Sequence, residues 1–228
     1  PEPTPFQVTV TDGSGVPITG SPFTISQGNP QSVVIGTVQP SVMMLSLADL
    51  NIPRTNKGLI AEGTGKFYAS FRLRAQNHAE ILVCKGTTGA GTAFRLGSLP
   101  MTSPGSLRNF VASFMATVDN TVVVLSDYDT GVVFASGTGN ITDDTQTFNL
   151  NAGQSVTVSG YTDSAPNLSG FVGALLTSNN PIVVNTGNAT GGMLTELSGQ
   201  DFNLDQIVPV DIVGDEYIVV KGNGSANT

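Results

Sequence analysis

Acidic residues in two polar loops are the side chains of this chain best suited to bind an ion. Asp127 and Asp129 lie in the segment SDYDTG, and Asp143 and Asp144 lie in NITDDT. Calcium takes carboxylate, carbonyl and hydroxyl oxygens from flexible loops, so these four aspartates are our candidate calcium ligands if the two loops lie side by side. A third candidate loop, GQDFNLDQ, contains Asp201 and Asp205. None of the three loops matches the twelve-residue helix-loop-helix calcium motif. The alternative is that these acidic turn residues are solvated or cap backbone amides.

Nucleophilic catalysis would depend on very few residues, because the chain has one histidine and one cysteine. His78, in QNHAEI beside Glu80, would have to serve any Ser-His-Asp or Cys-His arrangement, and we interpret it as a solvated turn residue. We interpret Cys84, in ILVCKG, as a buried strand residue. A single cysteine excludes an intramolecular disulfide and four-cysteine metal sites.

Carbohydrate chemistry has weaker support from the composition. Paired carboxylates that could hydrolyse a glycoside are present, but the chain has no tryptophan and only four tyrosines to hold a sugar ring. A sugar-binding site built from loop aspartates, asparagines and a tyrosine such as Tyr128 or Tyr161 needs fewer residues.

The elements that must position these loops are β-strands. Apolar residues alternate with small polar ones from position 109 to 160, and an alternation of period two is typical of half-buried strands. Turn-forming residues such as Asp119-Asn120 and Asn151-Ala152-Gly153 interrupt the pattern, so it predicts a four-stranded antiparallel meander. The predicted core consists of Phe110, Phe114, Val122, Val124, Phe148, Leu150, Val156 and Val158.

The overall composition excludes several kinds of partner. Only 11% of the 228 residues are charged and the formal net charge is −8, which argues against nucleic acid. The nine basic residues are scattered, apart from a loose group of Arg72, Arg74 and Lys85. No apolar run approaches the roughly 18 to 20 residues of a membrane-spanning helix, so we expect no membrane insertion.

Segments of the two halves of the chain resemble each other in order. PFTISQGNPQSVVIG, from Pro22, aligns with TFNLNAGQSVTVSG, from Thr147, and GLIAEGTGKFYAS, from Gly58, aligns with GALLTSNNPIVVN, from Gly173. RNFVAS, which contains Phe110, aligns with DEYIVV. Ordered matches predict a tandem duplication, with a first unit over 1–104 and a second over 105–228. Residues 215–228 would then open a third copy.

These patterns together predict an all-β protein made of two tandem antiparallel β-sandwich-like units. The alternative is a propeller-like arrangement of four-stranded blades, because the segment 109–160 could equally form one blade. Helix signals are nearly absent, although SVMMLSLADL, over 41–50, is compatible with one or two helical turns or with a strand.

Several of these motifs in combination carry a family resemblance. The segments NKGLIAEGTGKFYASFRLRAQNHAEILVCKG, LNAGQSVTVSGY, SNNPIVVNTGN and GQDFNLDQIVP make the chain from about Phe6 onward resemble the IgGFc-binding-type domain. That domain occurs in large surface proteins of Bacteroidetes, many of them similar to gliding-motility adhesins exported by the type IX secretion route. The resemblance does not by itself carry immunoglobulin binding over to this chain.

The resemblance implies a non-catalytic module of a secreted or cell-surface adhesin, next to other domains of a longer chain. Such a module would provide spacing and would contact an extracellular ligand, a carbohydrate or a surface glycoprotein, through its loops. A calcium-dependent carbohydrate-binding module is the first alternative, and a polysaccharide hydrolase is the second.

Overall fold

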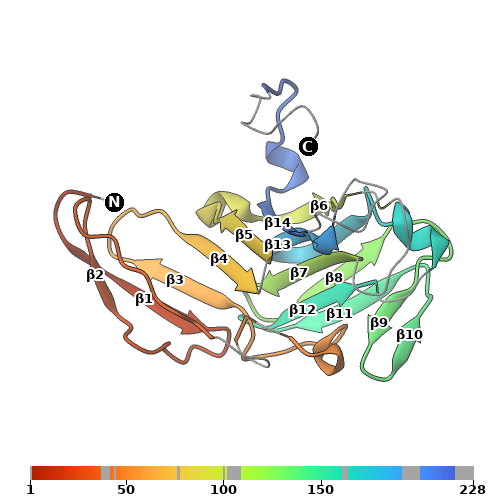
Figure 1. Ribbon diagram of the computed structural model, residues 1–228, viewed down its shortest axis with the longest axis horizontal. Helices are drawn as coiled ribbons and strands as arrows, with labels where there is room; N and C mark the ends of the chain where they lie inside the picture. Colours follow the sequence, from red (N-terminus) through yellow and green to blue (C-terminus); the bar gives the residue numbers. More distant parts are fainter. Residues whose placement is uncertain are drawn as a thin grey trace.

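A β-sandwich carrying a second, smaller sheet at one side makes up the computed structural model of the chain (Figure 1). The structure describes residues 2–36, 42–43, 45–75, 78–99, 101, 109–160, 164–191 and 201–218. Within these ranges the regular elements are strands and short 3-10 turns, so the prediction of an all-β, antiparallel, sandwich-like protein is confirmed. Of the segment 41–50, residues 41 and 44 lie outside the described residues, and the described part contains the turn η1 (Leu47–Asp49).

The described strands form four sheets. The first sheet is β1 (Phe6–Asp12), β2 (Phe23–Ile25) and β3 (Leu59–Gly63), and the second is the hairpin of β4 (Ser70–Ala75) and β5 (His78–Val83). The third sheet is β6 (Ala90–Arg95), β7 (Phe110–Ala116), β8 (Thr121–Ser126), β11 (Gln146–Leu150), β12 (Ser155–Ser159), β13 (Leu175–Gly191) and β14 (Asp201–Ile207). The short pair β9 (Phe134–Ser136) and β10 (Gly139–Ile141) is the fourth. Three further 3-10 turns are η2 (Gly86–Gly89), η3 (Ala165–Leu168) and η4 (Val210–Ile212).

The long strand β13 organises the sandwich. Its first part, 175–178, pairs with β8, and its second part, 182–188, pairs with β7. The strand order is therefore β11-β8-β13-β7-β12, with β6 and β14 also paired to β13. The predicted meander over 109–160 is wrong in its connectivity, because β13 lies between β7 and β8. The turn between those two strands forms an arch, in which the Thr117 N–H bonds the Pro181 carbonyl instead of continuing a hairpin ladder.

The core of the sandwich contains six of the eight predicted residues. Phe110, Phe114, Phe148, Leu150, Val156 and Val158 are buried. The rings of Phe114 and Phe148 meet edge to face at 5.3 Å between strands β7 and β11, which are not neighbours in the sheet. These contacts close the two layers over one apolar interior.

The prediction for β8 was wrong by one residue. Val122 is exposed and Val124 only half-buried, whereas Val123 and Leu125 are buried. The run Val-Val-Val-Leu is apolar at every position, so period two cannot determine which residues face inward. The phase is determined by the arch before the strand, where Asn120 has a φ of 56°.

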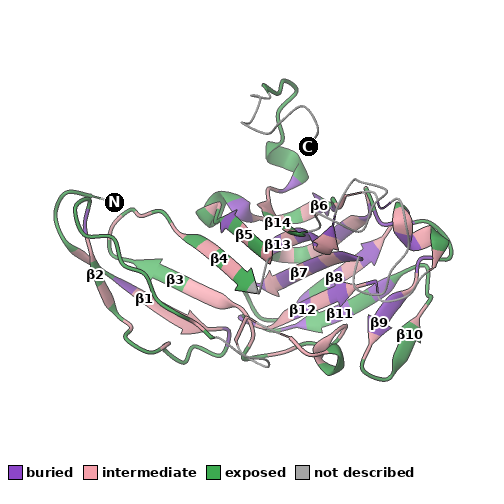
Figure 2. Cartoon of the chain, viewed as in Figure 1, coloured by how far each residue is buried: buried purple, intermediate pink, exposed green. Residues whose placement is uncertain are grey.

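The N-terminal sheet, made of β2-β1-β3, is much less buried than the sandwich (Figure 2). In the strands of this sheet Val8 is the one buried residue. The turn after β1 touches the turn between β11 and β12, because Gly13 and Gly153 approach backbone to backbone. A Cβ at Gly153 would lie 1.9 Å from the Gly13 carbonyl oxygen, so glycine is required at this contact.

The predicted boundary between two tandem units lies at 104/105, within 102–108 and outside the described residues. Strand β6, which precedes this boundary, pairs in one sheet with β13, which follows it. Phe110 is buried in β7, whereas Tyr217, its counterpart in the alignment, is exposed and outside any strand. The division into 1–104 and 105–228, and a third copy from 215, stay predictions from the sequence.

Candidate binding surface

The four aspartates predicted to bind calcium lie at one end of the sandwich. Asp127 has a φ of 58° and forms an ion pair with Arg95 at 3.0 Å, while Arg95 also bonds the Gly173 carbonyl. The Asp129 backbone N–H bonds the Gly170 carbonyl. Local hydrogen bonds of this kind hold the first loop in place.

Tyr128 joins this loop to the second one. Its hydroxyl donates a hydrogen bond to the Asp143 carbonyl, and its ring packs edge to face on Phe134 at 4.9 Å. Burial raises the pKa of the Tyr128 hydroxyl, with the nearby Asp144 and Asp143 acting in the same direction. The two loops thus adjoin each other as the calcium hypothesis requires.

A metal site requires several ligand side chains to converge on one point, which is a stricter condition than two loops lying side by side. Within the part of the chain that the structure describes, no three His, Cys, Asp or Glu side chains come together as a metal-binding group. The calcium assignment to Asp127, Asp129, Asp143 and Asp144 therefore stays a prediction.

His78 and Cys84 are not placed as the sequence predicted. His78 is not in a turn: it opens β5, half-buried against the Phe202 ring, with Nδ1 3.7 Å from the Asp201 carboxylate. Cys84 has the same parity as the buried Leu82 but is exposed, because β5 ends at Val83 and the alternation does not continue to position 84. Partial desolvation by the surrounding chain raises the pKa of the Cys84 thiol, which disfavours the reactive thiolate.

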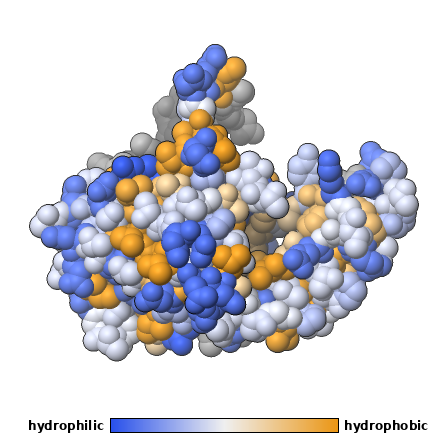
Figure 3. Space-filling model, turned by 180° about the vertical axis from the view of Figure 1, so that it is seen from behind, coloured by the Kyte–Doolittle hydropathy of each residue, from blue (hydrophilic) through white to orange (hydrophobic). Residues whose placement is uncertain are grey.

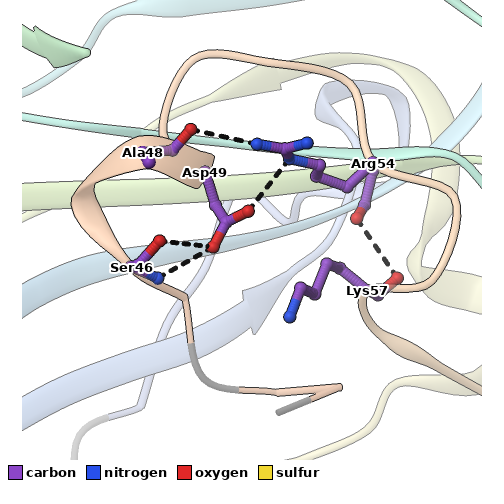
Figure 4. Close-up of polar contacts among 6 residues, drawn as sticks. Ser46, Ala48, Asp49, Arg54 and Lys57 are labelled. Atoms are coloured by element: carbon purple, nitrogen blue, oxygen red, sulfur yellow. Dashed lines mark hydrogen bonds and ion pairs between the residues drawn. The ribbon is translucent and has the colours of Figure 1, made fainter. Parts of the chain in front are cut away.

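The segment 46–57 contains the most connected charged cluster (Figure 4). The Asp49 carboxylate accepts hydrogen bonds from the Ser46 N–H at 3.0 Å and hydroxyl at 2.8 Å, and pairs with Arg54 Nε at 3.0 Å. Arg54 in turn donates to the Ala48 carbonyl. These bonds lower the pKa of Asp49, the Ser46 N–H contributing most.

This cluster braces the backbone of the segment and of β12. The Ser46 hydroxyl donates to a carboxylate with a lowered pKa, and neither His78 nor Cys84 takes part in its bonds. The Arg54 N–H and carbonyl bond the backbone of Ser155, so the segment lies along β12 and fastens it to the N-terminal sheet.

A groove between the N-terminal sheet and the β4–β5 hairpin is the clearest candidate for ligand contact. It has a volume of about 570 Å³ and is lined by Glu2, Gly65, Lys66, Phe67, Tyr68 and Thr87. Figure 3 shows the surface hollowed between the sandwich and the N-terminal sheet, with apolar residues at the bottom. Four of the lining residues belong to the link between β3 and β4.

Two aromatic side chains, Phe67 and Tyr68, line the groove. Phe67 packs against Phe6 with their ring centroids 6.5 Å apart, which anchors the link on β1. Tyr68 is 87% exposed and lines the groove, so its ring offers a large contact area to a ligand. The Lys66 backbone N–H donates a hydrogen bond to the Glu2 carboxylate at 3.3 Å, which ties the link to the N-terminal segment.

The β4–β5 hairpin presents a second exposed surface. Arg72 lies directly opposite Ile81, Ser70 opposite Val83, and Arg74 opposite Ala79, and all six residues are exposed on one face of the hairpin. We call this the hairpin face. Its other face packs against β14, where the Leu204 N–H bonds Glu80 and the Ala79 N–H bonds Asp201.

A family model described as IgGFc binding protein matches residues 79–228. The chain belongs to the IgGFc-binding protein family. The match begins in β5 and covers the sandwich, which confirms the family resemblance there, whereas the resemblance of the segment from about Phe6 to residue 78 stays a prediction. No curated protein and no solved structure matches this chain.

The matched family is a family of binding proteins. No helix in the described part of the chain is long and apolar enough to cross a membrane. The sequence reasoning missed Tyr68 because its neighbours, in GTGKFYAS, look like an ordinary turn. The group of Arg72 and Arg74 was visible, but the exposed aliphatic residues opposite them depend on strand register.

Proposed function

We propose that the chain is a non-catalytic extracellular binding module that serves adhesion and contacts a protein or glycoprotein ligand through the groove at Tyr68. The observation that carries the proposal is the exposed Tyr68 ring above a groove whose floor is fixed by the packing of Phe67 on Phe6. Tyrosine is enriched in binding surfaces because it offers a large, rigid contact area and a hydroxyl at low entropic cost.

The family description supplies the first ligand to test, which is the Fc part of immunoglobulin G. A mucin is the second, because the adhesin role implies contact with surface glycoproteins. Both probes are immobilised for biolayer interferometry, and the chain is compared with Tyr68→Ala and with Val172→Ala. Val172 is an exposed apolar residue on the sandwich, outside the groove, and serves as a matched control.

We expect binding to one of the two probes, with affinity lowered about 30-fold in Tyr68→Ala, the loss typical of a hot-spot residue. The Val172→Ala variant should bind as the parent does. Failure to bind either probe, or equal binding by Tyr68→Ala, contradicts the proposal. Hydrolysis of the mucin glycans by the purified chain would contradict its non-catalytic part.

A calcium-dependent carbohydrate-binding module is the second candidate function. It is favoured by the Tyr128 hydrogen bond to the Asp143 carbonyl, which places the two acidic loops next to each other. This function requires the melting temperature to rise by a few degrees in millimolar calcium, and mucin binding to disappear in EDTA. A melting temperature unaffected by calcium and by EDTA would falsify it.

A further inference from the structure

The last described segment of the chain is exposed and leaves the body of the molecule. After β14 the chain is anchored by Pro209, which is buried and lies against Gly91 of β6. Every residue from Val210 to Ile218 is exposed, and Figures 1 and 3 show this segment standing out from the sandwich. We call residues 210–218 the acidic arm.

The arm combines negative charge with large apolar side chains. Asp211, Asp215 and Glu216 form no ion pair within the described residues, and Tyr217 and Ile218 are 72% and 86% exposed. An aromatic and an aliphatic side chain held in water beside unpaired carboxylates indicate a segment that binds to something.

The hairpin face has the complementary properties. Arg72 and Arg74 have no ion-pair partner among the described residues, in a chain whose net charge is −8. Ile81, directly opposite Arg72, is 57% exposed, and Val83 is also exposed. Lys85, the basic residue that follows the hairpin, is already paired with Asp205 at 3.2 Å.

The edge of the hairpin can accept a further strand. Strand β4 pairs with β5 on one side, and no described strand pairs with its other side. A free edge leaves backbone N–H and C=O groups ready for an extended segment, which is how peptides add to sheets. As a strand, the arm would place Asp215 and Tyr217 on one side and Glu216 and Ile218 on the other. In either phase a carboxylate and an apolar side chain reach the face that carries the arginines.

We propose that the acidic arm of one copy of this chain docks along β4 on the hairpin face of a second copy, its carboxylates meeting Arg72 and Arg74 and its apolar residues covering Ile81 and Val83. The proposal rests on the charge and apolar complementarity of two surfaces of the same chain. It is independent of the groove, so Tyr68→Ala leaves this association unchanged.

Paramagnetic labelling tests the contact between copies. Cys84 is the single cysteine of the chain, is exposed, and follows directly after β5, so a nitroxide on Cys84 marks the hairpin. One sample of the chain carries the nitroxide and a second carries nitrogen-15, and the two are mixed. We expect the amide signals of residues 213–218 in the second sample to broaden. Signals that stay sharp in the mixture overturn the proposal. Broadening also overturns it if it occurs only when the nitroxide and nitrogen-15 are on the same molecule.

Charge variants test the chemistry of the contact. The double variant Arg72→Glu with Arg74→Glu should raise the self-association Kd at least tenfold, as measured by sedimentation equilibrium. For the parent chain, 0.5 M salt should also raise the Kd, because it screens charges with a Debye length of about 4 Å. Lys66→Glu, an exposed basic residue outside the hairpin face, is the control and should leave the Kd unchanged.

A charge swap distinguishes a specific contact from damage to the fold. The Asp215→Lys with Glu216→Lys variant should associate weakly with itself, but should pair with the Arg72→Glu, Arg74→Glu variant. Restored pairing in this mixture supports the proposal even if each variant alone is less stable. A mixture that stays monomeric, or a parent chain that is monomeric at all concentrations, contradicts it.

Discussion

The sandwich and the sheets around it show the same alternation of side chains along their strands, but they differ in how much of the alternating pattern is buried. In β7 the burial alternates strictly, and its inward residues meet strands of the other layer. In the β4–β5 hairpin the alternation produces an exposed face instead, with Ile81 and Val83 in water, and Tyr68 is exposed in the link that precedes β4. The comparison indicates that buried apolar contacts are concentrated in the sandwich, whereas the groove and the hairpin face, for which we propose binding, lie outside it.

The largest expected effect comes from opening the sandwich core. Phe114→Ala removes a fully buried ring that contacts Phe148, and we expect the free energy of unfolding to fall by about 3–5 kcal/mol. Val8→Ala, in the least exposed position of the N-terminal sheet, should cost no more than about 2 kcal/mol. Urea unfolding followed by circular dichroism measures both. Equal losses would show that the two regions share one core.

The contact between the two regions is tested at Gly153. Gly153→Ala places a Cβ against the Gly13 carbonyl in addition to the strain of a φ of 75°. Gly173→Ala is the matched control, because Gly173 has a φ of 88° and nothing within 4 Å of its Cβ position. The strain alone costs about 1–2 kcal/mol in both variants. We expect a further loss in Gly153→Ala alone, seen as faster proteolysis within residues 6–25, and equal proteolysis of the two variants would contradict the docking contact.

Sequence reasoning succeeded where a residue's environment is set by its own strand. The inward residues of β7, β11 and β12 were predictable because apolar and polar residues alternate there. It failed in β8, where every candidate residue is apolar. It also failed in the connectivity, because β13, which begins at Leu175, inserts between β7 and β8, which end at Ala116 and Ser126. Local pattern carries no information about such a distant insertion.

The candidate surfaces were less predictable for the same reason. The exposure of Tyr68 depends on the gap left between two sheets, and Arg72 faces Ile81 because of a hairpin register. Cys84 illustrates the limit: its apolar neighbours indicate burial, but the strand ends one residue before it.

A smaller change in the free energy of unfolding is expected from Asp49 in the segment 46–57, which ties the N-terminal sheet to β12, and this change depends on pH. Because the folded-state pKa of Asp49 lies below its ordinary value of 3.8, its stabilisation is complete above that value and is lost as pH falls through the folded pKa. We expect Asp49→Asn to lose about 1–2 kcal/mol at pH 7 and to approach the parent in acid. Thermal melts between pH 7 and pH 2.5 follow this difference. Asp211→Asn, at an exposed residue without an ion pair among those described, is the control; a gap that does not narrow in acid would exclude a charge effect.

The smallest effect is expected at the ion pair of the acidic loops, and it sharpens the calcium question. Arg95 and Asp127 are each about half exposed, so Arg95→Met should lower the free energy of unfolding in EDTA by less than about 1 kcal/mol. Removal of the guanidinium also releases the Asp127 carboxylate toward the loop that contains Asp143. If the four aspartates bind calcium, the melting temperature of Arg95→Met should therefore rise more in millimolar calcium than that of the parent. An equal response of the two proteins would mean that Asp127 is not a ligand, because only the variant has this carboxylate free of its cationic partner.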